Sequence, residues 1–121
     1  MKKTEIICSK DRLTVIEKTS VSIFQHIDIV GIFCEHPYLM IATTNKNKKL
    51  VFHSLKEIEQ LLPFPFVMCS RSAIINANHV VEIKTQKSNC FIVLNNGQKI
   101  LISRRKKSAI MEIIKRISTG L

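Results

Sequence analysis

Short apolar runs separated by polar residues dominate the sequence. Many of these runs are rich in Ile, Val, Phe and Thr, which fit the pleated, half-buried surface of a β-sheet. We predict strands at residues 5–9, 12–17, 20–25, 29–34, 38–44, 50–53, 66–69, 79–85, 90–94 and 99–103. The pattern therefore predicts a mainly β fold.

Polar turn residues connect two pairs of the predicted strands into hairpins. Residues 45–48, Asn-Lys-Asn-Lys, form one loop, and residues 95–97, Asn-Asn-Gly, form the other. Asn96 and Gly97 can both adopt the positive φ angles that a type I′ turn requires. We therefore expect a tight turn of this type in the second hairpin.

Two segments have helical spacing instead. In the first, Ser54 and Glu57 are placed as a capping box, and Pro63 ends the helix. Its apolar face consists of Leu55, Ile58, Leu61 and Leu62. The second helix starts from Ser103 and ends before Gly120. Its apolar face consists of Ala109, Ile110, Ile113, Ile114 and Ile117.

Four cations open the second helix: Arg104, Arg105, Lys106 and Lys107. The helix dipole prefers anions at this end, so the charges oppose it as well as one another. A nucleic-acid backbone would relieve that repulsion, and the backbone amides of the first turn would add to a phosphate site. The alternative is a solvated helix start whose lysines serve solubility.

The distribution of charge favours the first interpretation. The net charge is +10 over 121 residues. Residues 1–60 contain nine Lys and Arg against seven Asp and Glu, a balance of +2, whereas residues 61–121 contain ten against two, a balance of +8. A basic half is typical of a binding face. No linker or repeat divides the chain, so we expect one domain.

Several functional classes find little support. No run approaches the roughly 18 apolar residues of a membrane span, and no signal-peptide core follows the first lysines, so we expect a cytoplasmic protein. The cysteines and histidines lack metal-ligand spacing, and the three glycines form no phosphate loop. We therefore predict neither an enzyme nor a metal or cofactor site.

The segment around Arg71 is more informative. Ser70 and Ser72 flank this arginine between two apolar stretches. A surface or structural arginine is the common interpretation, but a guanidinium with two hydroxyls also suits a guanine edge and nearby phosphates. Asn76 and Asn78 are more typical of turns and backbone hydrogen bonding.

Cys69 lies two residues before Arg71, which leaves two interpretations of its thiol. Oxidation of Cys69 would disturb the Arg71 loop if the thiol were reactive. A buried, inert thiol is the more common state of a cysteine whose neighbours on one side are apolar, as they are here. The sequence favours the inert thiol.

The order of motifs resembles the LytTR family of bacterial DNA-binding domains. The matching segments are residues 54–62 (SLKEIEQLL), 66–76 (FVMCSRSAIIN), 79–83 (HVVEI), 94–97 (LNNG) and 100–105 (ILISRR). The resemblance is strongest over residues 29–117, and we take residues 1–121 as a single domain of this kind.

The resemblance implies packed antiparallel sheets with few helices, and loops that enter the major groove of repeated promoter elements. It places Arg71 and Arg105 against bases, together with a third loop that contains His36 and Tyr38. Phosphate contacts fall to Ser70, Ser72, Ser103, Arg104, Lys106 and Lys107. The implied partner is double-stranded DNA, bound by two copies of the chain, and the implied function is sequence-specific transcription regulation.

Three departures from the family pattern affect this interpretation. The third loop is short and contains Pro37, Ser70 replaces the family's usual histidine, and no receiver domain is encoded in this sequence. The input must then come from a protein partner, from dimerisation or from concentration. The second hypothesis is accordingly an interaction or antagonist module that binds a protein partner and has weak DNA affinity. The scarcity of aromatic residues on basic strands disfavours an RNA-binding platform. The basic helix has few bulky residues on its polar border, which disfavours a membrane-surface binder.

Overall fold

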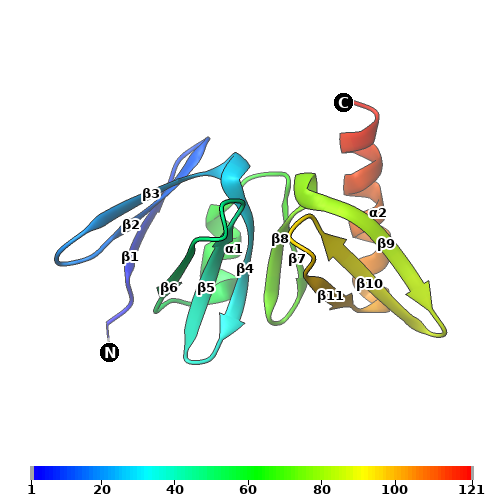
Figure 1. The fold of residues 1–121 in the computed structure, drawn as a ribbon, viewed down its shortest axis with the longest axis horizontal. Helices are drawn as coiled ribbons and strands as arrows, with labels where there is room; N and C mark the ends of the chain where they lie inside the picture. Colours follow the sequence, from blue (N-terminus) through cyan, green and yellow to red (C-terminus); the bar gives the residue numbers. More distant parts are fainter. Residues whose placement is uncertain (1, 121) are drawn as a thin grey trace.

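The structure is a computed structural model and describes residues 2–120. Three antiparallel sheets stand side by side (Figure 1). The first contains β1 (Glu5–Cys8), β2 (Arg12–Ile16) and β3 (Val21–Gln25). The central sheet, in the order β6-β5-β4-β8-β7, contains β4 (Ile29–Glu35), β5 (Tyr38–Thr43), β6 (Lys48–Val51), β7 (Phe66–Ser70) and β8 (Ala73–Asn76). The third contains β9 (Val80–Gln86), β10 (Asn89–Leu94) and β11 (Lys99–Ile102).

Two α-helices and two short 3₁₀ turns complete the fold. The helices are α1 (Leu55–Leu61) and α2 (Arg104–Ser118), and the turns are η1 (His26–Asp28) and η2 (Ala77–His79). The prediction of a mainly β fold with packed antiparallel sheets, one short internal helix and a C-terminal helix is confirmed. No helix within residues 2–120 is long and apolar enough to cross a membrane.

The central sheet is buried on both faces, and this explains its continuous apolar runs. One face packs with the first sheet and α1 around a cluster that includes Leu13, Ile32 and Ile58. The other packs with the third sheet and α2 around a cluster that includes Ile75, Ile92 and Ile110. The sheet therefore forms the middle layer, and its loops are positioned by packing on both sides.

Strand β8 was missed in the sequence because burial on both faces removes its alternation. All four of its residues, Ala73–Asn76, are buried, and the strand lies between β4 and β7. Strand β6 begins at Lys48, two residues before the predicted start. The prediction followed apolar residues, whereas the ladder pairs Ala42 with Lys48 through backbone groups.

Close approach of β4 to β8 depends on Gly31. A Cβ atom at this position would lie 2.8 Å from the carbonyl oxygen of Ile74 and 2.6 Å from the Phe33 ring. The neighbouring Asn76 is buried, and its amide donates to the carbonyl oxygens of Ile29 (3.0 Å) and His26 (3.1 Å). The prediction that Asn76 bonds to backbone is confirmed.

The hairpin between β10 and β11 is present, but its predicted turn type is wrong. Gly97 has a positive φ of 87°, whereas Asn96 does not. The Gly97 N–H donates to the Leu94 carbonyl oxygen (2.8 Å), and the Leu94 N–H donates to that of Gln98 (2.9 Å). This is the longer type of hairpin loop, in which a type I turn is followed by a glycine in the left-handed conformation. The other predicted loop is found between β5 and β6, where Lys46 is left-handed.

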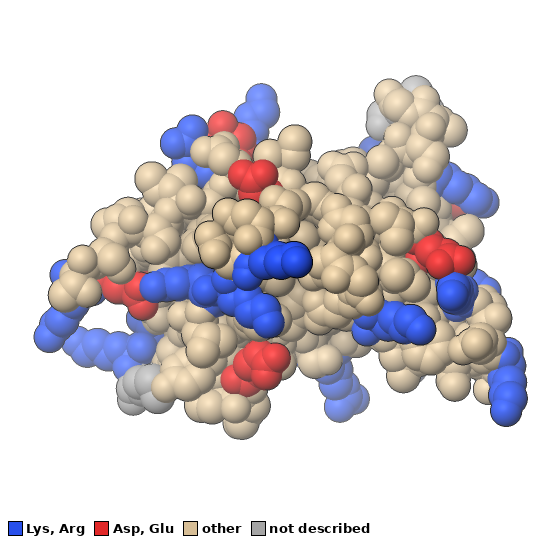
Figure 2. Space-filling view, viewed as in Figure 1, with Lys and Arg blue, Asp and Glu red and all other residues tan. Residues whose placement is uncertain are grey.

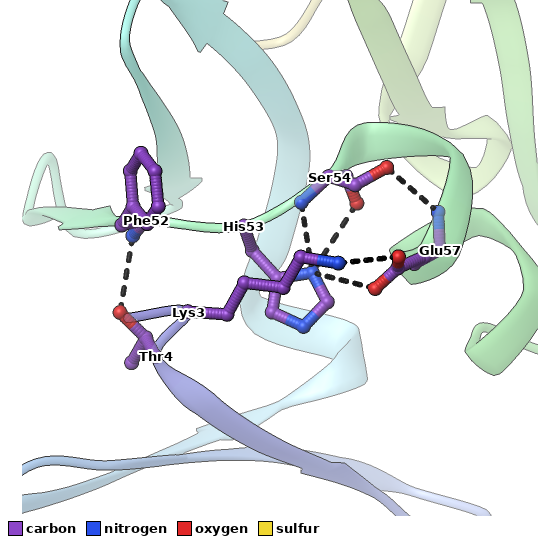
Figure 3. Close-up of polar contacts among 6 residues, drawn as sticks. All are labelled: Lys3, Thr4, Phe52, His53, Ser54 and Glu57. Carbon is purple, nitrogen blue, oxygen red and sulfur yellow. Dashed lines mark hydrogen bonds and ion pairs between the residues drawn. The ribbon is translucent and has the colours of Figure 1, made fainter. Parts of the chain in front are cut away.

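Helix α1 has half of the expected capping box. The Ser54 Oγ accepts the Glu57 N–H (3.3 Å), but the Ser54 N–H donates to His53 Nδ1 (2.9 Å) instead of to the Glu57 carboxylate. That carboxylate forms an ion pair with Lys3 (Figure 3). The predicted apolar face is narrower than expected, because Leu61 is 45% exposed.

Helix α2 buries one side chain completely. Ile110 is fully buried, whereas Ala109 on the predicted apolar face is exposed. The remaining predicted residues Ile113, Ile114 and Ile117 are half-buried. Near the end of the helix, the Arg116 guanidinium lies 4.8 Å from the centre of the Phe64 ring. The residues of the first turn of the helix, 104–107, are all exposed.

Candidate nucleic-acid interface

The turn between β7 and β8 presents Arg71 to solvent. The Ser72 N–H donates to the Ser70 Oγ (3.2 Å), and the two hydroxyl oxygens lie 3.3 Å apart. One hydroxyl therefore donates to the other, and one proton remains for an external acceptor. This local bonding fixes the turn while the Arg71 side chain stays exposed.

The turn between β4 and β5 lies directly beside it. The Cys34 N–H donates to the Ser72 carbonyl oxygen (2.8 Å), and the Cys34 Sγ lies 4.0 Å from the carbonyl oxygen of Arg71. His36 is exposed in this two-residue turn, and its peptide bond to Pro37 is cis. Tyr38 is oriented differently, because its ring packs edge-on against Phe52 at a centroid distance of 6.4 Å.

The first turn of α2 forms the third element. The Ser103 Oγ accepts the Lys106 N–H (3.3 Å), and the Ser103 carbonyl oxygen accepts the Lys107 N–H (3.1 Å). The sequence suggested the amides of this turn for a phosphate, but those of Lys106 and Lys107 already donate to Ser103. The amides of Arg104 and Arg105 have no acceptor within residues 2–120. The Ser103 hydroxyl keeps its own proton for donation.

An open groove of about 720 Å³ connects two of these three elements, the β7–β8 turn and the start of α2. It extends from the β7–β8 turn past the start of α2 to the turn between β9 and β10. Its lining residues are Ser70, Thr85, Lys87, Ser88, Asn89, Cys90, Leu101, Ile102, Ser103, Arg104 and Lys107. All four turns lie along the lower edge in Figure 1.

The cations of this edge lack acidic partners. None of Arg71, Arg104, Arg105, Lys106 and Lys107 forms an ion pair with another described residue. The carboxylates that do form pairs lie elsewhere, at Asp11, Glu17, Glu57 and Glu82. Lysine and arginine side chains project beyond the lower right outline of Figure 2. Cations without acidic partners attract a polyanion, and the one exposed carboxylate beside the β4–β5 turn, Glu35, pairs with none of them.

Burial separates Cys69 from this chemistry. Its side chain is fully buried, and desolvation raises the pKa of the thiol to about 11, although the Lys106 charge and a backbone hydrogen bond oppose the rise. A thiol with this pKa is almost entirely protonated at neutral pH and is a poor target for oxidants. The inert interpretation of Cys69 is therefore favoured.

The profile of the LytTr DNA-binding domain matches residues 18–115. The chain belongs to this family. A solved structure, the LytTr DNA-binding domain of a Bacillus cereus protein described as a methyl-accepting/DNA response regulator, is similar with a TM-score of 0.73 and 21% sequence identity. The match covers 88% of this chain and 98% of that one, and at this identity it supports the fold alone. No curated protein matches the sequence.

Family membership makes this LytTr domain a DNA-binding domain of the kind that acts in transcription regulation. The structure brings the predicted loops of this LytTr domain to one edge, and it gives Tyr38 a packing contact that the sequence did not reveal. Sequence reasoning did not include the β9–β10 turn, which lines the groove with Lys87. Its composition, Gln-Lys-Ser-Asn, resembles that of any polar hairpin turn.

Proposed function

We propose that this LytTr domain is a sequence-specific regulator of transcription that inserts loops into the major groove of double-stranded DNA. The observation that carries the proposal is that unpaired cations from the β7–β8 turn and from the start of α2 gather along one edge, beside the β4–β5 turn. A flat basic surface would attract DNA without discrimination. Turns that project from a rigid sheet can instead reach base edges.

Base recognition falls to the side chains at the tips of the turns. Arg71 and Arg105 supply the guanidinium forks that match the O6 and N7 acceptors of guanine. His36 and Tyr38 are the candidates from the β4–β5 turn, with His36 more freely exposed and Tyr38 held against Phe52. The fixed positions of these turns support readout at separate base pairs.

Phosphate contacts fall to the surrounding donors, whose role is to set the register of the domain on DNA. The hydroxyls of Ser70, Ser72 and Ser103 supply hydrogen bonds. The charged groups are those of Arg104, Lys106 and Lys107. We propose that two copies bind repeated promoter elements in the cytoplasm.

The first experiment is selection of bound molecules from randomised duplex DNA at near-physiological salt. A compact, repeated motif is the expected result. Arg71→Ala should then weaken binding to the selected site by about 1–3 kcal/mol and relax the preference at one base position. Equal losses on selected and random DNA would contradict base reading by Arg71. Absence of enrichment with folded protein would favour the module that binds a protein partner.

A further inference from the structure

We propose that the β9–β10 turn is a fourth DNA-contacting element, in which Lys87 binds a phosphate of the duplex backbone. This inference rests on the proposed function and extends it to a turn outside the three loops described above. The turn belongs to the third sheet, whereas Arg71 belongs to the central one. The two are joined by a common groove.

The charged and polar residues that line the groove suit a phosphodiester chain. Lys87, Arg104 and Lys107 give it three cations, and no carboxylate lines it. Hydroxyl and amide groups stand between the charges, from Ser70, Thr85, Ser88, Asn89 and Ser103. These are the side chains that position DNA backbones, because they donate to phosphate oxygens without discriminating between bases.

The groove adjoins the Arg71 turn, and this indicates which phosphates of the duplex would lie in it. Ser70 belongs to that turn and also lines the groove. A backbone that flanks the base contacted by Arg71 therefore enters the groove at Ser70, passes the start of α2 and leaves beside Lys87. The ligand is one strand of the same duplex.

The second groove of the molecule provides a contrast. It has a volume of about 990 Å³ and lies between the β5–β6 and β10–β11 turns. It contains Lys46 and Lys48, but Glu35 also lines it. The β5–β6 turn is at the opposite end of β5 from the proposed base-reading turn. Its cations are therefore not expected to reach the DNA.

The two grooves also provide a matched pair of variants. Lys87 (φ 55°) and Lys46 (φ 67°) are left-handed residues in hairpin turns. Asparagine tolerates this conformation better than most residues, so Lys87→Asn and Lys46→Asn remove the same charge with little backbone disturbance. Lys87→Gly offers a second variant that accepts a positive φ, and Lys87→Arg retains the charge.

The experiment measures affinity for selected and random duplexes over a range of salt concentrations, with thermal unfolding as the control for folding. Lys87→Asn and Lys87→Gly should lower the affinity for both duplexes about fivefold and reduce the salt slope by about 1. Lys87→Arg should restore both values. Lys46→Asn should bind like the unsubstituted protein.

Unchanged affinity and salt slope in Lys87→Asn and Lys87→Gly would overturn the inference, and an equal loss in Lys46→Asn would reduce it to a general charge effect. The proposed function is tested separately in the same assay. If Arg71→Ala loses specificity while the Lys87 variants bind normally, only the fourth contact is wrong. If the unsubstituted protein binds no duplex, both proposals fail.

Discussion

The two α-helices begin with the same kind of cap but with different charges in the first turn. Ser54 and Ser103 each accept the N–H three residues later at 3.3 Å. The first turn of α1 contains Glu57, which agrees with the helix dipole, whereas the first turn of α2 contains only cations. The capping residue thus determines where each helix starts, irrespective of the charge that follows.

The surroundings of the two starts explain the difference. At α1, the Glu57 carboxylate forms an ion pair with Lys3 and lies 3.9 Å from His53 Nδ1, so its charge is balanced within the chain (Figure 3). The Phe52 N–H donates to the Thr4 hydroxyl oxygen next to Lys3. At α2, the cations have no acidic partner among the described residues. A charge arrangement that opposes folding locally indicates a binding role.

The largest expected effect comes from reversing the charge at α2. Lys106→Glu with Lys107→Glu should lower DNA affinity by at least about 25-fold, because each lost phosphate contact removes about fivefold near physiological salt. The same change should stabilise the helix by about 0.3–1 kcal/mol per position. Duplex titrations and thermal unfolding would measure these opposite effects.

The matched change at the other helix is Lys56→Glu, which alters an exposed first-turn lysine of α1. This variant should retain the DNA affinity of the unsubstituted protein. An equal loss in Lys56→Glu would show that net charge, and not position, determines binding. Normal DNA binding by the doubly substituted α2 would remove that turn from the interface.

Removal of the caps should have a smaller effect on stability. Ser54→Ala and Ser103→Ala should each lower the free energy of unfolding by about 1 kcal/mol, measured by chemical denaturation. Only Ser103→Ala should also weaken DNA binding, because Ser103 lines the groove and Ser54 does not. If both variants bound DNA equally well, the proposed phosphate contact of Ser103 would be wrong.

The smallest expected effect is a dependence on pH at α1. Hydrogen bonding from Lys3 lowers the pKa of Glu57, and the charges of Lys3 and His53 act in the same direction against a desolvation that raises it. The carboxylate therefore stabilises the fold above the ordinary glutamate pKa, and this contribution is lost as pH falls through the lowered value. Lys3→Met should flatten the acid side of the stability profile, recorded as the unfolding midpoint. An unchanged profile would show that the pair is not formed in solution.

The sequence predicted most of this architecture because alternation and capping are local properties. It missed β8, because this strand is buried on both faces and its apolar residues therefore do not alternate with polar ones. It assigned the wrong turn before Gly97, because a dipeptide that permits two positive φ angles does not require them.

The candidate site was predicted in part for similar reasons. Arg71 and the α2 cations stand out among their sequence neighbours, and the structure brings the β7–β8 turn and the start of α2 to one edge. Lys87 does not stand out in the sequence, because the contact proposed for it depends on a groove that it lines with residues from another sheet and a helix. The packing of Tyr38 against Phe52 likewise depends on strand pairing between β5 and β6.

The hydrogen bond from Cys34 to Ser72 has a consequence for the kinetics of recognition. It ties together turns that are distant in sequence, so His36 and Arg71 are carried on one supported unit. Little conformational entropy is then lost when the two turns meet DNA, compared with loops that must first become ordered. Encounters with a correct site should accordingly proceed at a rate governed by electrostatic attraction and orientation, and discrimination should appear in how long the domain stays bound.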